Sequence, residues 1–133
     1  MGKSKKEGGA GKLLTETELE LMTILWRLGE GSVADVLENL PKERELAYTS
    51  VSTILRILEQ KQILKTRKEG RGHIYIPAVA KTEYEARTVK HMVSRVFNGA
   101  PVSLVRQLVE AVELGPKEIE ELRKIIDAAG RKK

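Results

Sequence analysis

The chain has 133 residues with 41% apolar and 4% aromatic side chains, which suits one small domain, or a domain with an appendage, around an aliphatic core. Its first twelve residues are polar, and no stretch holds the roughly 20 apolar residues of a membrane span, so we expect no secretion signal, no membrane contact and a cytoplasmic location. The net charge of +5 is uneven, because residues 56–71 hold six basic and two acidic side chains, which favours a polyanionic partner.

The start of the chain predicts a tail and a first helix. Residues 1–12 are rich in Gly and Lys, and we expect a disordered basic tail there. Thr15 followed by Glu18 has the spacing of a capping box, and the apolar run behind them stops at Gly29. The sequence therefore predicts a helix that starts at Thr15 and is buried on more than one face.

Two more helices are predicted after the first. Ser32 with Asp35 caps residues 33–40, a second short helix that ends at Pro41. Residues 48–60 have the apolar stripe of an amphipathic helix: Val51, Ile54, Leu55 and Leu58. The opposite face bears short hydroxyl groups and one arginine but no acid: Thr49, Ser52, Thr53, Arg56 and Gln60. Joined by a polar connector, these helices predict a loose helix-turn-helix in a tri-helical unit.

After the third helix the pattern changes to the alternation of β-strands. Residues 63–79 predict two short strands around a turn at residues 70–72, a hairpin that would form a wing. Ile74 and Ile76 flank Tyr75 and share a face, so we expect the isoleucines to pack inward and Tyr75 to lie on the wet face. Basic side chains gather at the tip: Arg67, Lys68 and Arg71.

The rest of the chain, residues 80–130, predicts three helices, the last closed by Gly130. Large aliphatic side chains recur along them at helical spacing: Val89, Met92, Val93, Val96, Leu104, Leu108, Val112, Leu122, Ile125 and Ile126. Three short helices cannot cover so many, and soluble monomers avoid large exposed apolar patches. We therefore expect a helical dimerisation domain here, after a winged-helix domain over residues 13–79. An intramolecular lid on that domain is the alternative.

Catalysis finds little support in the sequence. His73 and His91 are the only side chains suited to acid–base work near neutral pH, and they belong to different predicted elements. The chain has no cysteine, and nothing in it resembles a phosphate-cradling glycine loop, a nucleophile elbow or a metal-binding pair. We expect no enzyme, and we assign no catalytic residue, metal ligand or cofactor.

Double-stranded DNA as a partner would explain the acid-free face of residues 48–60. A helix in the major groove needs slim side chains without acids, because the phosphates repel acids. Hydroxyl groups can donate to phosphates or bases, Arg56 can reach a guanine or a phosphate, and Tyr48 can hold the backbone where the helix enters. The alternative is a winged-helix protein–protein interaction module whose basic wing meets an acidic partner. Steep salt dependence would separate DNA binding from that alternative.

Two long stretches of the chain read "LTETELELMTILWRLGEGSVADVLENLP" and "LAYTSVSTILRILEQKQILKTRKEGRGHIYIP". Together they resemble the penicillinase-repressor (BlaI/MecI) family of bacterial winged-helix repressors. The likeness continues to about residue 127 through "VFNGAPVSLVRQLVE" and "LGPKEIEELRKIID". The resemblance implies a mainly α (α+β) fold, with an N-terminal winged helix-turn-helix, a two-stranded wing and a C-terminal three-helix dimerisation region. It also implies a transcriptional repressor that acts as a homodimer on a pseudo-palindromic operator.

The resemblance assigns site residues as well. The family's DNA contacts lie on the third helix and the wing, which correspond here to Tyr48, Thr49, Ser50, Ser52, Thr53, Arg56, Arg67, Lys68, Arg71 and His73. Members induced by β-lactams have a further partner, a membrane sensor protease that cuts an Asn-Phe bond after a Ser-Leu-Val run. Here residues 103–106 read Ser-Leu-Val-Arg and Gln107-Leu108 follow, which argues against that partner. The copper-responsive members end in a cysteine pair, which this chain lacks.

Overall fold

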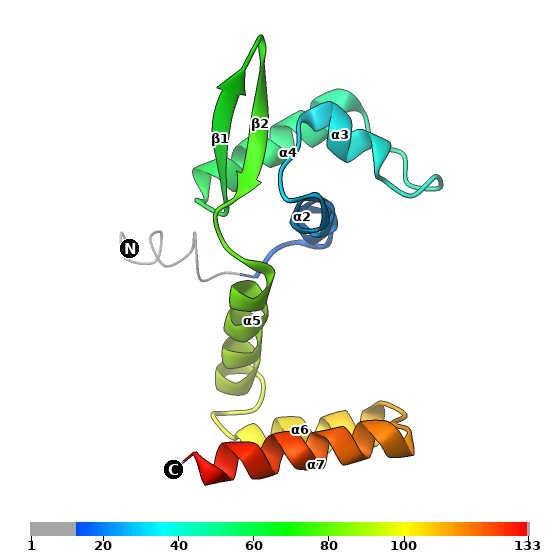
Figure 1. Ribbon diagram of the computed structural model, residues 1–133, viewed down its shortest axis with the longest axis vertical. Helices are drawn as coiled ribbons and strands as arrows, with labels where there is room; N and C mark the ends of the chain where they lie inside the picture. Colours follow the sequence, from blue (N-terminus) through cyan, green and yellow to red (C-terminus); the bar gives the residue numbers. More distant parts are fainter. Residues whose placement is uncertain (1–12, 133) are drawn as a thin grey trace. The chain divides into compact units, whose positions relative to one another are not determined.

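A computed structural model describes residues 13–132 of the chain (Figure 1). Its elements in chain order are α2 Glu16–Leu28, α3 Val33–Glu38, α4 Tyr48–Gln60, β1 Leu64–Glu69, β2 Gly72–Pro77, α5 Lys81–Arg95, α6 Pro101–Ala111 and α7 Pro116–Arg131. The predicted fold class, mainly helical with a two-stranded antiparallel wing, is confirmed. The predicted basic tail lies outside the described residues. The chain divides into two compact units, one ending at Thr88 and the next starting at Val89.

The first two helices begin where their capping residues predict. The Thr15 hydroxyl accepts from the Glu18 N–H at 3.1 Å, and the Glu18 carboxylate accepts from the Thr15 N–H at 2.9 Å. Ser32 and Asp35 make the same reciprocal pair in front of α3. Helix α2 ends at Leu28, and its C-cap is Gly29, whose φ of +93° is strained for any residue with a side chain. Helix α3 is shorter than predicted and ends at Glu38.

The core of the first unit forms where α2, α3, α4 and the base of the hairpin meet. Its members are the predicted apolar faces of the helices together with residues that follow α4: Leu21, Met22, Ile24, Leu25, Val33, Val36, Val51, Leu55, Leu58, Ile63, Leu64, Tyr75 and Val79. Side chains of this kind contribute roughly 1.5–3 kcal/mol each when fully buried. The amphipathic pattern of α4 is thus used as predicted, with its apolar stripe inside.

The hairpin corrects one prediction. Tyr75 is only 5% exposed and belongs to the core, whereas Ile74 and Ile76 are half-buried. The prediction that the isoleucines pack inward and Tyr75 stays wet is therefore wrong. Tyr75 is held by its backbone as well, since it exchanges N–H···O bonds of 2.7 and 3.0 Å with Gly31. Gly31 thereby lies along the free edge of β2, so β2 runs between it and β1.

The start of α5 belongs to the first unit. The Trp26 indole N–H donates to the Val79 carbonyl at 2.9 Å, and the Trp26 and Tyr84 rings lie 5.8 Å apart. The Tyr84 hydroxyl accepts from the Leu14 N–H at 3.0 Å. These contacts extend the unit past residue 79, where we predicted the winged-helix domain to end, into the first turns of α5.

The second unit holds the rest of α5 together with α6 and α7. A turn separates α5 from α6, with positive φ at Asn98 and Gly99, and the Gly99 N–H donates to the Val93 carbonyl at 2.7 Å. Helix α7 continues through Gly130 to Arg131, so the predicted stop at Gly130 is wrong. No side chain of α5, α6 or α7 is fully buried.

Candidate nucleic-acid interface

Helix α4 presents the predicted polar residues together on its outer side. Tyr48 is 57% exposed, and Thr49, Ser50, Thr53 and Arg56 are exposed as well. Ser52 is the one residue of the predicted set on this helix that is half-buried. Because Val51, Leu55 and Leu58 are buried on the opposite side, the polar face cannot turn inward without emptying the core.

The first turn of α4 is open to an anion. Its N-cap residue, Ala47, makes no side-chain capping hydrogen bond, and the turn carries no acid. The first backbone N–H groups of a helix have no partner within the helix, and the helix dipole places partial positive charge beside them. A shallow hollow lined by Thr49, Ser50, Thr53 and Ile54 lies next to this end. An oxyanion there would meet hydroxyl groups and backbone N–H groups together.

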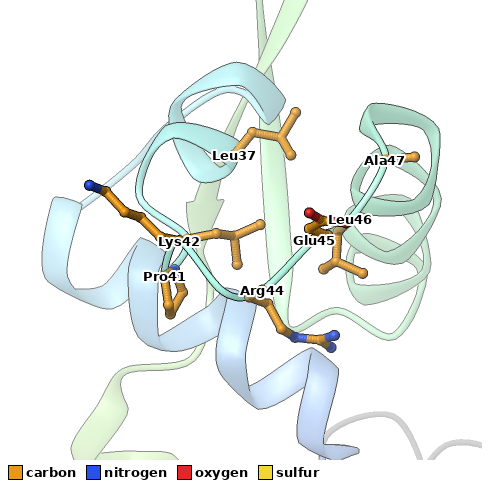
Figure 2. Close-up of a pocket in the computed structure, with 8 residues that line it drawn as sticks. Leu37, Pro41, Lys42, Arg44, Glu45, Leu46 and Ala47 are labelled. Atoms are coloured by element: carbon orange, nitrogen blue, oxygen red, sulfur yellow. The ribbon is translucent and has the colours of Figure 1, made fainter.

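The connector between α3 and α4 fixes where that end of the helix lies. Figure 2 shows the hollow it encloses, lined by Leu37, Leu40, Pro41, Lys42, Arg44, Glu45, Leu46 and Ala47. The Arg44 guanidinium donates from Nε to Glu20 Oε1 at 2.8 Å and from Nη2 to Thr17 Oγ1 at 3.1 Å, and both acceptors belong to α2. The sequence gives no local sign of this anchor, because the partners of Arg44 lie 24 and 27 residues away.

The wing residues of the predicted interface fall into two groups. Lys68, Arg71 and His73 are exposed near the tip. Arg67 instead donates from both Nη atoms to the two oxygens of Glu30, at 3.1 and 3.0 Å, and from Nη2 to Glu69 at 3.0 Å. The hydrogen bonds that Arg67 donates to Glu30 and then to Glu69 raise the pKa of Arg67, and the contact with Arg67 lowers the pKa of Glu30.

Tyr75 lies in the core beneath the wing, on the face opposite to the one predicted. Burial raises the pKa of its hydroxyl, and so does the nearby charge of Glu59, while Arg56 opposes the rise. Thr66, its cross-strand neighbour, donates a hydrogen bond to Glu59 at 3.1 Å. One face of the hairpin therefore lies over α4 beside Arg56.

The described residues offer little for other chemistry. Among residues 13–132, no group of three or more His, Cys, Asp or Glu side chains is arranged to hold a metal ion. His73 lies on β2 and His91 on α5, so the two histidines belong to different elements, as predicted. Every helix in this part of the chain is too short or too polar to cross a bilayer.

A tri-helical unit followed by an antiparallel hairpin defines a winged-helix protein of the helix-turn-helix class. The family model for the penicillinase repressor matches residues 14–128, and the chain belongs to this family. The family resemblance seen in the sequence is thereby confirmed, and the chain is assigned to a family of repressors rather than of enzymes.

Individual relatives agree with the family. The chain is 27% identical to the methicillin resistance regulatory protein MecI of Mammaliicoccus sciuri over 86% of its own length and 93% of the relative's. It is 28% identical to the penicillinase repressor of Bacillus licheniformis, over 86% and 89% of the two chains. Among solved structures, the DNA-binding domain of the repressor BlaI matches with a TM-score of 0.50 and 27% identity, covering 56% of this chain and 90% of that domain.

Proposed function

We propose that this protein is a DNA-binding transcriptional repressor that reads double-stranded DNA with α4. The observation that carries the proposal is the exposed, acid-free face of this helix, in which hydroxyl groups and Arg56 surround an uncapped N-terminus. Such a face suits both the phosphates and the base edges of a major groove. The relatives support the proposal, because two are named as a repressor and a resistance regulator and a third was solved as a repressor's DNA-binding domain.

The residues at the two ends of this face would do different work. Tyr48, Thr49 and Ser50, at the open first turn, would hold phosphates and fix the register of the helix. Ser52, Thr53 and Arg56, further along, would face base edges. Arg56 is the side chain best suited to specificity, because its guanidinium can donate two hydrogen bonds to one guanine.

The working form in this proposal is a homodimer on an operator with two-fold symmetry. The second unit exposes large aliphatic side chains, including Val96 just after α5 at 63%, and Ile125 and Ile126 on α7 at 64% and 58%. Others of the predicted set are also uncovered: Val89 at 47%, Leu108 at 40% and Val112 at 49%, with Met92, Val93, Leu104 and Leu122 half-buried. A second copy presenting the same side chains would cover them. Two recognition helices would then meet half-sites a whole number of DNA turns apart.

The experiment that tests this function is selection of bound duplexes from a random library by the intact protein, followed by affinity measurements across salt concentrations. We expect enrichment of an inverted repeat and a steep fall of affinity with salt, about 0.9 in logarithmic slope for each phosphate contact. Failure to enrich any sequence, together with salt-insensitive binding to an acidic protein, would overturn DNA binding and favour the protein-interaction alternative.

A further inference from the structure

The two faces of the wing carry different sets of charged side chains. Directly paired residues of an antiparallel hairpin share a face, and neighbours along a strand alternate between faces. Lys68 pairs with His73, and two residues along, Thr66 pairs with Tyr75, so these four side chains share the face that lies over α4. Lys65, Arg67 and Glu69 are on the other face, which we call the clamp face.

On the clamp face, Arg67 is held by carboxylates from two segments. Glu30 accepts hydrogen bonds from both Nη atoms of the guanidinium, and Glu69 accepts one from Nη2. The three side chains together carry one positive and two negative charges. Glu30 precedes Gly31, the residue paired with Tyr75 along the edge of β2. The bidentate contact therefore reaches across β2 and ties β1 to the turn between α2 and α3.

We propose that Arg67 positions the wing and does not contact phosphate, and that the face of Lys68 and His73 is the one that meets DNA. This inference rests on the proposed function. Three of the five N–H donors of the Arg67 guanidinium are already given to carboxylates. The group formed by Arg67, Glu30 and Glu69 has a net negative charge, which the DNA backbone repels. The opposite face continues through Thr66, whose hydroxyl donates to Glu59 of α4.

The contact between Glu30 and Arg67 can fix the direction of the wing. A two-stranded hairpin is barely stable by itself, so its direction depends on what fastens it to the helices. The hydrogen bond from Thr66 to Glu59 fastens one face to α4, and the Glu30–Arg67 contact fastens the other to the α2–α3 turn. Exposed ion pairs add little to stability, and the expected effect of this one is on the direction of the wing.

The test compares Arg67→Gln, Glu30→Gln and their double variant with Lys68→Gln, a matched loss of charge one residue along the same strand. The salt dependence of the affinity is measured on a labelled random-sequence duplex, and the affinity at one salt concentration on the duplex enriched by selection. Both measurements are corrected for the fraction of each variant that is active. We expect Lys68→Gln to make the salt slope shallower by about 0.9, while Arg67→Gln and Glu30→Gln keep the wild-type slope. Each of the latter two should weaken binding to the selected duplex several-fold, and the double variant no more than either alone.

Other outcomes overturn the proposal in distinguishable ways. If Arg67→Gln makes the salt slope as shallow as Lys68→Gln does, while Glu30→Gln binds more tightly than the wild type, Arg67 is a phosphate contact that Glu30 restrains. Thermal unfolding without DNA gives an independent readout, in which additive effects of the two clamp substitutions would show that they do not act as a pair. If the wild-type protein binds neither duplex, the proposed function itself fails, and the assignment of the DNA-facing side fails with it. If Arg67 only stabilised the fold, Arg67→Gln would lower the melting temperature and leave the affinity of the folded fraction unchanged. That result would also overturn the positioning role.

Discussion

Arg44 and Glu20 join the connector that precedes α4 to the side of α2, through an Nε–Oε1 contact of 2.8 Å. The two side chains are 37% and 25% exposed, and Thr17 accepts a second hydrogen bond from the same guanidinium. Because the connector leads directly into Ala47, the N-cap of α4, this contact sets where the open end of the helix begins.

Replacing Arg44 by Gln should therefore weaken binding to the selected duplex while the salt slope stays near that of the wild type. We expect a loss of stability of only about 1 kcal/mol or less, because the pair is partly exposed. Lys42→Gln is the matched control, since it removes the same charge from an exposed position in the same connector. Equal effects of the two substitutions would mean that charge, and not the anchor, is what matters.

Arg56→Ala tests base reading by α4. If the exposed guanidinium pairs with a base, affinity for the selected duplex should fall by roughly 1–3 kcal/mol and discrimination against random duplexes should shrink. Gln60→Ala, at the exposed end of the same helix, serves as the control. An equal loss on selected and random duplexes would reduce Arg56 to a phosphate contact, and no loss on either would remove α4 from the interface.

Glu18 should make the fold sensitive to acid. Burial raises the pKa of its carboxylate, but hydrogen bonds from Lys61 and the Thr15 N–H, with the charge of Lys61, outweigh burial and bring the pKa below its ordinary value of 4.5. A carboxylate with a lowered folded-state pKa stabilises the fold above its unfolded pKa, and this contribution is lost as pH falls through the folded one. The Lys61–Glu18 contact of 2.8 Å joins α4 to α2, so its loss loosens the core.

Glu18→Gln should lower the free energy of unfolding by about 1 kcal/mol at neutral pH, because Gln keeps a cap acceptor but loses the charge. The difference from wild type should shrink as pH falls below 4.5. Denaturant unfolding across this pH range measures it, with Glu16→Gln in the same first turn as the control. A difference that stays constant with pH would show that folding does not shift the pKa of this carboxylate.

The proposed dimer is tested by sedimentation of the intact chain and of a chain that ends at Thr88. Ending at residue 88 keeps Tyr84, whose ring packs on Trp26. We expect a dimer for the intact chain, and a folded monomer with much weaker operator binding for the shorter one. Ile125→Glu in the intact chain should also give monomers, whereas the neighbouring Lys124→Glu should not. A monomeric intact chain that binds its operator tightly would disprove the dimer.

Local patterns in the sequence predicted the helix starts, and tertiary contacts decided the rest. Thr15 and Glu18 lie three residues apart, so their capping box can be seen without the fold. Strand alternation showed that Ile74 and Ile76 share a face but not which face meets the core, and the fit of the Tyr75 ring decided that. Arg67 looked like a free cation, because its main partner, Glu30, lies 37 residues earlier in the chain.

The hydrogen bond from Trp26 to the Val79 carbonyl gives the protein an internal optical probe. Trp26 is the only tryptophan in the sequence, so its emission reports on one place, where α2, the end of β2 and the first turns of α5 meet. Any event that draws α5 away would break this contact and expose the indole to water, and its fluorescence would shift to longer wavelength. The Trp26 fluorescence of unlabelled protein would then reveal, in real time, whether binding to DNA moves the first turn of α5.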